Sequence, residues 1–106
     1  MTDKIVVFST CETEADARRI ATHLVDRRLA ACVSILPAAT CVYRWEGAVN
    51  STGECVLIIK SRRDLLKKIA DEFVSIHPYD MPELIAMPVV DGSGAYLDWL
   101  DLELGN

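Results

Sequence analysis

Apolar positions along the chain change their spacing several times, and each change predicts a new element. A continuous apolar run at 5–8 is typical of a strand that is covered on at least one face by helix. After Thr13, a suitable N-cap residue, apolar positions recur at helical spacing as far as Leu29. Residues 31–36 then predict a second strand. Pro37 cannot donate a ladder hydrogen bond, so we expect a bulge or break there.

The middle of the sequence predicts a long β-hairpin over about 40–60. Residues 41–46 alternate apolar and polar side chains, residues 50–53 (Asn-Ser-Thr-Gly) predict a turn, and residues 54–60 return to a strand pattern. Each arm of about ten residues spans roughly 33 Å when extended. Because a domain of this size has a radius of gyration of roughly 13 Å, the hairpin must either curl or project beyond its own core.

The last third of the chain predicts a helix, a strand and a further helix. Ser61 is a suitable cap for the first helix, and Pro78 ends it because the residue before proline avoids the α region. Residues 84–90 predict the fourth strand and residues 95–104 a terminal amphipathic helix. The order βαββαβ plus one helix predicts a single α+β domain over 1–106: a ferredoxin-like sandwich with a long β-hairpin and an extra C-terminal helix.

The predicted hairpin carries apolar side chains that one copy of the chain has no means to cover. A projecting apolar hairpin favours aggregation unless another surface packs on its edges. The simplest cover is a second copy of the same chain. The terminal helix, which a two-layer core does not require, is a further candidate for sealing an interface.

Charge and composition exclude several classes of function. The net charge of −5 argues against nucleic-acid binding, and the basic pairs fall in helix-like segments where solvated faces are expected. The longest apolar runs are too short to cross a bilayer, and Met1–Lys4 shows no basic region before a long apolar stretch. We therefore expect a cytoplasmic protein without membrane contact. Its four cysteines are then reduced thiols, and their spacing does not suit a structural zinc site.

Four stretches of the chain, at matching order and spacing between about Ile5 and Leu100, resemble the CutA divalent-cation-tolerance family. They are Leu29-Ala30-Ala31-Cys32-Val33 leading to Pro37, Val42-Tyr43-Arg44-Trp45-Glu46-Gly47, His77-Pro78-Tyr79 followed by Pro82-Glu83, and Tyr96-Leu97 with Trp99. The resemblance implies a ferredoxin-like fold. It also implies a tight homotrimer in which hairpins extend a neighbour's sheet, an architecture similar to that of the trimeric PII signalling proteins.

The same resemblance implies a metal ligand, chiefly copper or another divalent cation. In some family members a cysteine at the end of the first strand and the histidines before Pro-Tyr bind copper. Here Ser9 occupies that cysteine position and Cys11 lies two residues later, on the same strand face. Only His77 remains of the double histidine, because Ile76 replaces the first.

We predict that Cys11, His77 and Glu83 lie near one intersubunit cleft and bind a soft or borderline cation such as copper or zinc. Each residue also has a structural interpretation. His77 would cap a helix end, Cys11 would be a small buried hydrophobe instead of an activated thiolate, and Glu83 would form a salt bridge. The candidate cleft residues are Tyr43, Trp45, Lys60 and Tyr79.

The favoured function is a metal-binding trimer without turnover, and three alternatives stay open. One is a small-molecule sensor built like PII, although the sequence has no Gly-rich phosphate loop. Another is a thiol- or metal-dependent enzyme that uses the three predicted ligands. The third is a scaffold that anchors another protein.

Overall fold

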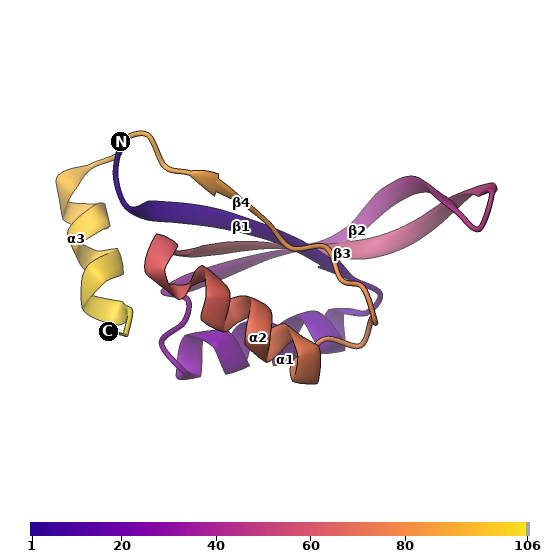
Figure 1. The fold of residues 1–106 in the computed structure, drawn as a ribbon, viewed down its shortest axis with the longest axis horizontal. Helices are drawn as coiled ribbons and strands as arrows, with labels where there is room; N and C mark the ends of the chain where they lie inside the picture. The colour runs from indigo at the N-terminus through magenta and orange to yellow at the C-terminus, as the bar shows by residue number, and fades with distance from the viewer. Residues whose placement is uncertain (106) are drawn as a thin grey trace.

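The chain folds into one sheet with helices packed against it, as seen in the computed structural model, which describes residues 1–105 (Figure 1). The elements in chain order are β1 (Lys4–Cys11), α1 (Glu14–Asp26), β2 (Cys32–Trp45), β3 (Ala48–Arg62), a 3₁₀ turn (Arg63–Leu65), α2 (Leu66–Ile76), β4 (Ile85–Pro88) and α3 (Gly94–Glu103).

The sheet of the described residues has the strand order β2-β3-β1-β4, and every neighbouring pair is antiparallel. Helices α1 and α2 lie on the same side of it (Figure 1). This order and layering confirm the predicted ferredoxin-like α+β fold, with the extra helix α3 at the C-terminal end.

The core lies between the sheet and the two long helices. Alternate residues of β1 and β3 are buried on the helix side, because successive strand side chains point to opposite faces. Helix α1 contributes an apolar stripe at helical spacing, and Ile69 and Phe73 do the same from α2. The largest fully buried apolar side chains are Val7, Ile20, Leu24, Leu57, Ile59, Leu65 and Ile69.

The turn of the hairpin differs from the prediction. It is formed by Glu46 and Gly47, with φ values of +50° and +79°, whereas residues 50–53 lie within β3. Two successive positive φ values fit a two-residue hairpin turn, whose twist matches that of the strands. The predicted break at Pro37 is confirmed, since the register shifts between Leu36 and Ala39.

Two element boundaries also differ from the prediction. Ser61 does not cap α2: it lies in β3, is fully buried and donates its hydroxyl to the carbonyl of Leu29 at 2.6 Å. A 3₁₀ turn begins the helix instead, at Arg63. Helix α1 ends at Asp26, before the predicted Leu29, and β4 is shorter than the predicted 84–90.

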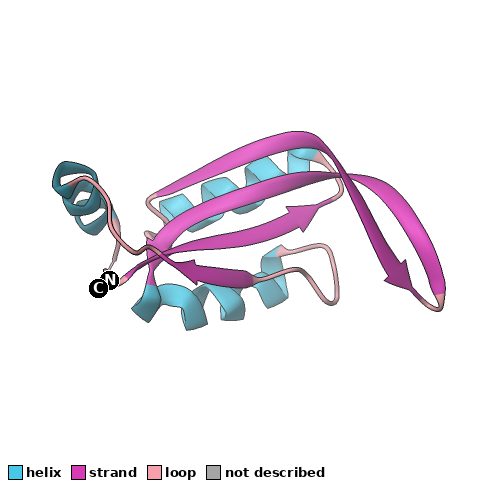
Figure 2. Cartoon of the chain, turned by 90° about the horizontal axis from the view of Figure 1, so that it is seen from above, coloured by secondary structure: helices cyan, strands magenta, loops and turns pink. Residues whose placement is uncertain are grey.

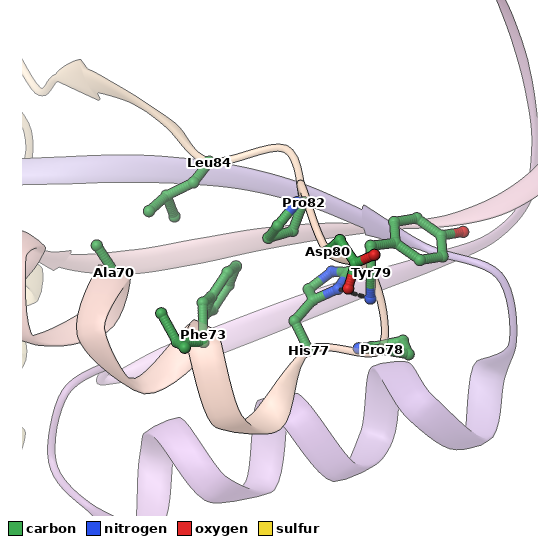
Figure 3. A pocket seen from close by; sticks show the side chains of 9 residues that line it. Ala70, Phe73, His77, Pro78, Tyr79, Asp80, Pro82 and Leu84 are labelled. Carbon is green, nitrogen blue, oxygen red and sulfur yellow. Dashed lines mark hydrogen bonds between the residues drawn. The ribbon is translucent and has the colours of Figure 1, made fainter. Parts of the chain in front are cut away.

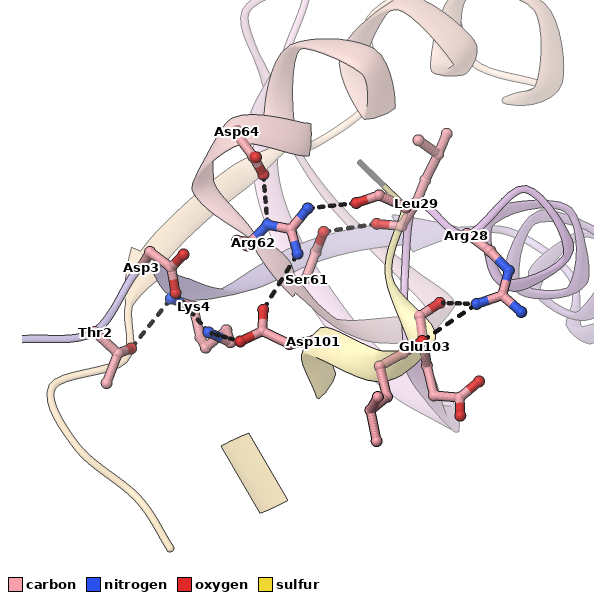
Figure 4. Close-up of polar contacts among 12 residues, drawn as sticks. Thr2, Asp3, Lys4, Arg28, Leu29, Ser61, Arg62, Asp64, Asp101 and Glu103 are labelled. Atoms are coloured by element: carbon pink, nitrogen blue, oxygen red, sulfur yellow. Dashed lines mark hydrogen bonds and ion pairs between the residues drawn. The ribbon is translucent and has the colours of Figure 1, made fainter. Parts of the chain in front are cut away.

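Helix α3 is attached to the rest of the fold by apolar packing, and ion pairs tie it to the start of β1 and the end of β3 (Figure 4). Leu100 and Leu104 are buried in the core. Asp101 lies 3.1 Å from Nζ of Lys4 and 3.2 Å from Nη1 of Arg62, so one carboxylate joins both strands to the helix.

The sheet face opposite α1 and α2 is apolar and is left open along much of its area. Val6, Phe8, Val56 and Ile58 are half-buried there, and Leu36, Ile85 and Met87 are exposed. The hairpin carries further exposed apolar side chains, among them Val42, Trp45 and Val49. It extends past the helices, which is one of the two outcomes expected from its length (Figure 2). Along its longest axis the molecule measures 44 Å. Among the described residues, helices that are long and apolar enough to span a membrane are absent.

Candidate functional site

His77 is the centre of a polar cluster at the end of β1. It is the C-cap residue of α2, where Pro78 prevents the helix from continuing, and only 7% of it is exposed. Its Nδ1 accepts a hydrogen bond from the backbone N–H of Tyr79 at 3.1 Å, which places the proton on Nε2. Nε2 then donates to the carbonyl of Thr10 at 2.9 Å and lies 3.4 Å from Oγ of Ser9.

The surroundings of His77 favour its neutral form. Burial lowers the pKa of His77, against a smaller opposing effect of the Thr10 hydrogen bond. The rings of Phe73 and Tyr79 flank the imidazole, with centroids at 5.4 and 5.0 Å. A cation that bound His77 would therefore replace one of its two hydrogen bonds to the backbone.

A nearly buried carboxylate lies on the other side of Tyr79. Glu54, which is 9% exposed, accepts the Tyr79 hydroxyl, with both carboxylate oxygens 3.0 Å away. Oγ1 of Thr52 lies 3.4 Å from the same group. Burial and the Glu54 carboxylate together raise the pKa of Tyr79, so its hydroxyl stays protonated and keeps donating.

Cys11 is a buried thiol and not an activated one. Its exposed fraction is 0%, and its S–H donates to the carbonyl of Thr13 at 3.5 Å. Burial, followed by the neighbouring Cys55 thiol, raises the pKa of Cys11 to about 11. Its place before the N-terminus of α1 therefore does not produce the lowered pKa that an activated thiolate requires.

The predicted ligands occupy different environments in one copy of the chain. Cys11 is adjacent in sequence to Thr10, which accepts from His77, whereas Glu83 is exposed in the segment before β4. Within residues 1–105, groups of three or more His, Cys, Asp or Glu side chains placed to hold a metal ion are not found. The joint site of Cys11, His77 and Glu83 at an intersubunit cleft stays a prediction.

The candidate cleft residues lie on separate parts of the protomer. Tyr43 and Trp45 are exposed near the hairpin turn. Lys60 lies toward the other end of β3, where its Nζ donates to Oγ of Ser34 at 2.7 Å on the open sheet face. Tyr79 is held against Glu54. One copy of the chain therefore does not form a cleft from all four.

A cavity of about 340 Å³ opens beside His77, between α2 and the segment that leads to β4 (Figure 3). Its wall combines apolar side chains with three residues that carry polar groups, His77, Tyr79 and Asp80. The lining residues are Ala70, Phe73, Val74, His77, Pro78, Tyr79, Asp80, Pro82 and Leu84.

Glu54 and the backbone of Thr10 belong to the cluster, although the sequence pattern predicts neither of them as a site residue. Glu54 had one available signal, a charged residue at the start of the apolar run 55–59. The role of Thr10 had none, because a backbone carbonyl carries no residue-specific mark. The Tyr79–Glu54 contact joins segments that only the folded sheet brings together.

Comparison with known proteins gives a family for this fold and cluster. The family model described as CutA1 divalent ion tolerance protein matches residues 5–103. The divalent-cation tolerance protein CutA of Thermus thermophilus is 43% identical over 90% of this chain and 92% of its own length. The chloroplastic protein CutA of Arabidopsis thaliana is 44% identical over 91% of the chain, which spans only 53% of that relative.

Solved structures agree with the sequence comparison. The crystal structure of CutA from Xylella fastidiosa has a TM-score of 0.94 at 38% identity, covering 98% of this chain and 100% of that one. CutA1 from Oryza sativa also has a TM-score of 0.94, at 39% identity, covering 96% of this chain and 94% of that one. The chain therefore belongs to the CutA1 divalent ion tolerance protein family.

Proposed function

We propose that this chain forms a homotrimer that binds copper or another divalent cation and acts in metal homeostasis without catalytic turnover. Family membership supports the role in cation tolerance. The observation that carries the assembly is the open apolar face of the sheet, which lies opposite both long helices.

A cytosolic location fits four free thiols, which persist in a reducing compartment. The names of two relatives instead place those proteins in the chloroplast and the periplasm.

The open face supports self-association, because burying its exposed apolar side chains against another copy removes them from water and is favourable. Val6 pairs with Met87, and Phe8 pairs with both Ile58 and Ile85, so one apolar surface runs across three strands. Burial of such a surface contributes about 25 cal/mol for each Å² removed from water. The exposed strands β2 and β4 at the sheet edges offer unpaired backbone groups that a neighbour's hairpin would pair with.

The assembly is tested by native mass spectrometry of the full chain and two matched variants. Ile85→Glu places a charge on the open face, and we expect it to shift the trimer to monomer. Val74→Glu places the same charge on the exposed side of α2, and we expect it to leave the trimer intact. A wild-type monomer, or equal dissociation by both variants, would contradict the proposal.

The proposed metal site draws on donors at the end of β1. A thiolate with an imidazole suits copper or zinc better than magnesium. Both groups are buried and neutral, so binding must release the Cys11 proton and break one hydrogen bond of His77. Glu83, exposed before β4, is the proposed carboxylate ligand at the cleft between subunits.

The metal site is tested by titrating chelator-free protein with Cu(I), Cu(II) and Zn(II) in the same mass spectrometer. We expect about three ions per trimer, and we expect Cys11→Ser and His77→Ala to lose them. Cys41→Ser and His23→Ala are the matched controls, because each removes the same type of donor elsewhere. Uptake that persists in Cys11→Ser and His77→Ala would assign the ions to other groups.

The cavity beside His77 favours a second candidate function, a sensor of a small molecule. Its volume of about 340 Å³ and its mixed wall, in which His77, Tyr79 and Asp80 stand among apolar side chains, fit a small polar ligand. Such a ligand would raise the melting temperature of the trimer when metals do not. Ala70→Leu, which fills part of the cavity, should abolish that shift, and a shift that survives this change would place the ligand elsewhere.

A further inference from the structure

Two of the four cysteines lie directly opposite each other in the sheet. Cys11 and Cys55 are Cα partners in the register of β1 and β3, at the last pair of β1. Both side chains point to the helix side, where 0% of Cys11 and 4% of Cys55 is exposed. The position follows from the strand period, since Cys11 alternates with Ser9 and Cys55 with Leu57 on the buried face.

The spacing of such a pair is within the range that a disulfide spans. Directly opposed residues in antiparallel strands have Cα atoms about 4.5 to 5.5 Å apart. Disulfides join residues whose Cα atoms are about 4.4 to 6.8 Å apart. Cys11 is also the last residue of β1 and precedes a bend, so the backbone there is not held by a further strand pair.

The other two cysteines lack this arrangement. Cys32 is opposite Lys60, whose Nζ lies 3.8 Å from the Cys32 sulfur, on the open face of the sheet. Cys41 is opposite Thr52 in the hairpin. Of the four thiols, only Cys11 and Cys55 are therefore register partners, and the fold selects a single intrachain pairing.

We propose that Cys11 and Cys55 are a redox modification site, at which a two-electron oxidant such as a peroxide forms a reversible disulfide between β1 and β3. One thiol loses its proton, and its sulfur attacks a peroxide oxygen. The O–O bond breaks, which leaves a sulfenic acid and a hydroxide that takes up the proton. The second thiol then displaces the sulfenic oxygen as water and forms the S–S bond. Two thiols and one peroxide yield one disulfide and two waters.

The reduced pair is the resting state of the folded protein. Burial keeps both sulfurs away from bulk oxidant, and the raised pKa of Cys11, about 11, leaves little thiolate at neutral pH. Oxidation therefore proceeds through local opening at the end of β1, and we expect it to be slow compared with that of an exposed thiol.

The disulfide would close a loop that contains α1, β2 and the whole hairpin turn. Such a cross-link restricts the unfolded chain, so the oxidised protein should be harder to unfold than the reduced one. For native-like geometry we expect the unfolding equilibrium constant to fall roughly 30- to 1000-fold. The same bond removes the Cys11 thiol from metal binding, a corollary that rests on the proposed function.

The test is peptide mapping of the full-length protein after hydrogen peroxide treatment and alkylation of the remaining thiols. We expect a cross-link between the peptides of Cys11 and Cys55, the loss of two hydrogens, reversal by dithiothreitol and a higher denaturant midpoint. The double variant Cys32→Ala with Cys41→Ala should give the same cross-link. Cys11→Ala and Cys55→Ala, made separately so that one can substitute if the other fails to fold, should each lose it.

Other products would overturn the proposal. A disulfide that involves Cys32 or Cys41, or that joins two chains, would show that the sheet register does not select the partner. Oxidation of Cys11 or Cys55 to sulfinic acid without a cross-link would show that the two sulfurs do not meet. None of these outcomes depends on metal uptake or on the number of subunits, so the proposed function is tested separately.

Discussion

His77 joins the end of α2 to the end of β1, because its two ring nitrogens bond the backbone of Tyr79, two residues away, and the backbone of Thr10, which is distant in sequence. The Nδ1 acceptor fixes the turn at Tyr79, and the Nε2 donor fixes the end of β1 at Thr10. The single ring works as a neutral structural linker in the protomer. A charged imidazolium would lose the Nδ1 acceptor and would bring a charge into a site that excludes water.

We predict that His77 makes the folded protein less stable as the pH decreases. Its folded pKa lies below the ordinary 6.5, so the unfolded chain takes up the proton first as the pH decreases. The free energy of unfolding should therefore decline as the pH falls below 6.5. Urea titrations over this window should show the decline in wild type and in His23→Gln, and a weaker decline in His77→Gln. An unchanged slope in His77→Gln would assign the effect to another group.

Tyr79→Phe should destabilise the fold by about 1–3 kcal/mol, because it leaves the buried Glu54 carboxylate without its main donor. Tyr43→Phe, which removes the same hydroxyl from an exposed hairpin position, should be nearly neutral. Chemical denaturation of both variants and of the wild type measures the change in the free energy of unfolding. Adding Glu54→Gln to Tyr79→Phe should recover part of the loss, and full additivity of the two changes would argue against a direct interaction.

At the scale of elements, the hairpin turn depends on backbone conformation more than on side-chain packing. A Cβ added at Gly47 or at Gly53 would meet no atom within 4 Å, but only Gly47 has a positive φ, of +79°. The two glycines are therefore a matched pair that isolates backbone strain, because neither substitution causes a steric clash.

We predict that Gly47→Ala destabilises the protein by about 1 kcal/mol, since side chains disfavour left-handed φ values. Gly53→Ala should instead be neutral or stabilise by about 0.5 kcal/mol, because alanine loses less freedom in a strand. Denaturation midpoints measured at equal protein concentration compare the two. Equal effects of the two changes would show that the turn does not impose its φ on the chain.

Asp101 attaches helix α3 to the sheet, because its carboxylate pairs with both Lys4 of β1 and Arg62 of β3. Hydrogen bonds from these two side chains lower the pKa of Asp101 below 3.8. The contribution of the Asp101 ion pairs to stability is therefore complete above the pKa of Asp101 in the unfolded chain. It is lost as the pH falls through the lower pKa of Asp101 in the folded protein.

We expect Asp101→Asn to speed hydrogen exchange of the α3 amides near neutral pH, because Lys4 and Arg62 lose their shared partner. Asp98→Asn, on an exposed position of the same helix, should leave the exchange unchanged. Mass spectrometry of amide exchange resolves α3 from the rest of the chain. If both variants exchanged alike, apolar packing of Leu100 and Leu104 would be sufficient to hold the helix.

At the scale of the whole molecule, the sequence predicted the order of elements well and their ends less well. Changes of apolar period mark strands and helices because burial on one face enforces them. Turns are marked weakly: Asn-Ser-Thr-Gly at 50–53 has a stronger turn composition than Glu46-Gly47, yet pairing with β2 keeps it in the strand. The long-range pairing outweighs the local preference.

The site was harder to predict than the fold, for a physical reason. The strand period places Cys11 on the buried face, and Pro78 places His77 at a helix end, so both positions follow from local patterns. Their chemistry follows from neighbours that the period does not identify, namely the Thr10 carbonyl for His77 and Cys55 for Cys11. Glu54 was not predicted because its partner Tyr79 lies in the segment after α2, 25 residues away in the sequence.

The central position of β1 has a consequence for the order of events during synthesis. This strand leaves the ribosome well before its partners β3 and β4, since Ile5 pairs with Ser61 and with Pro88. Translation adds roughly 5–20 residues per second, so the apolar run of β1 waits for seconds without a strand partner. The apolar run of β1 is therefore exposed to aggregation during synthesis until the second half of the protein emerges.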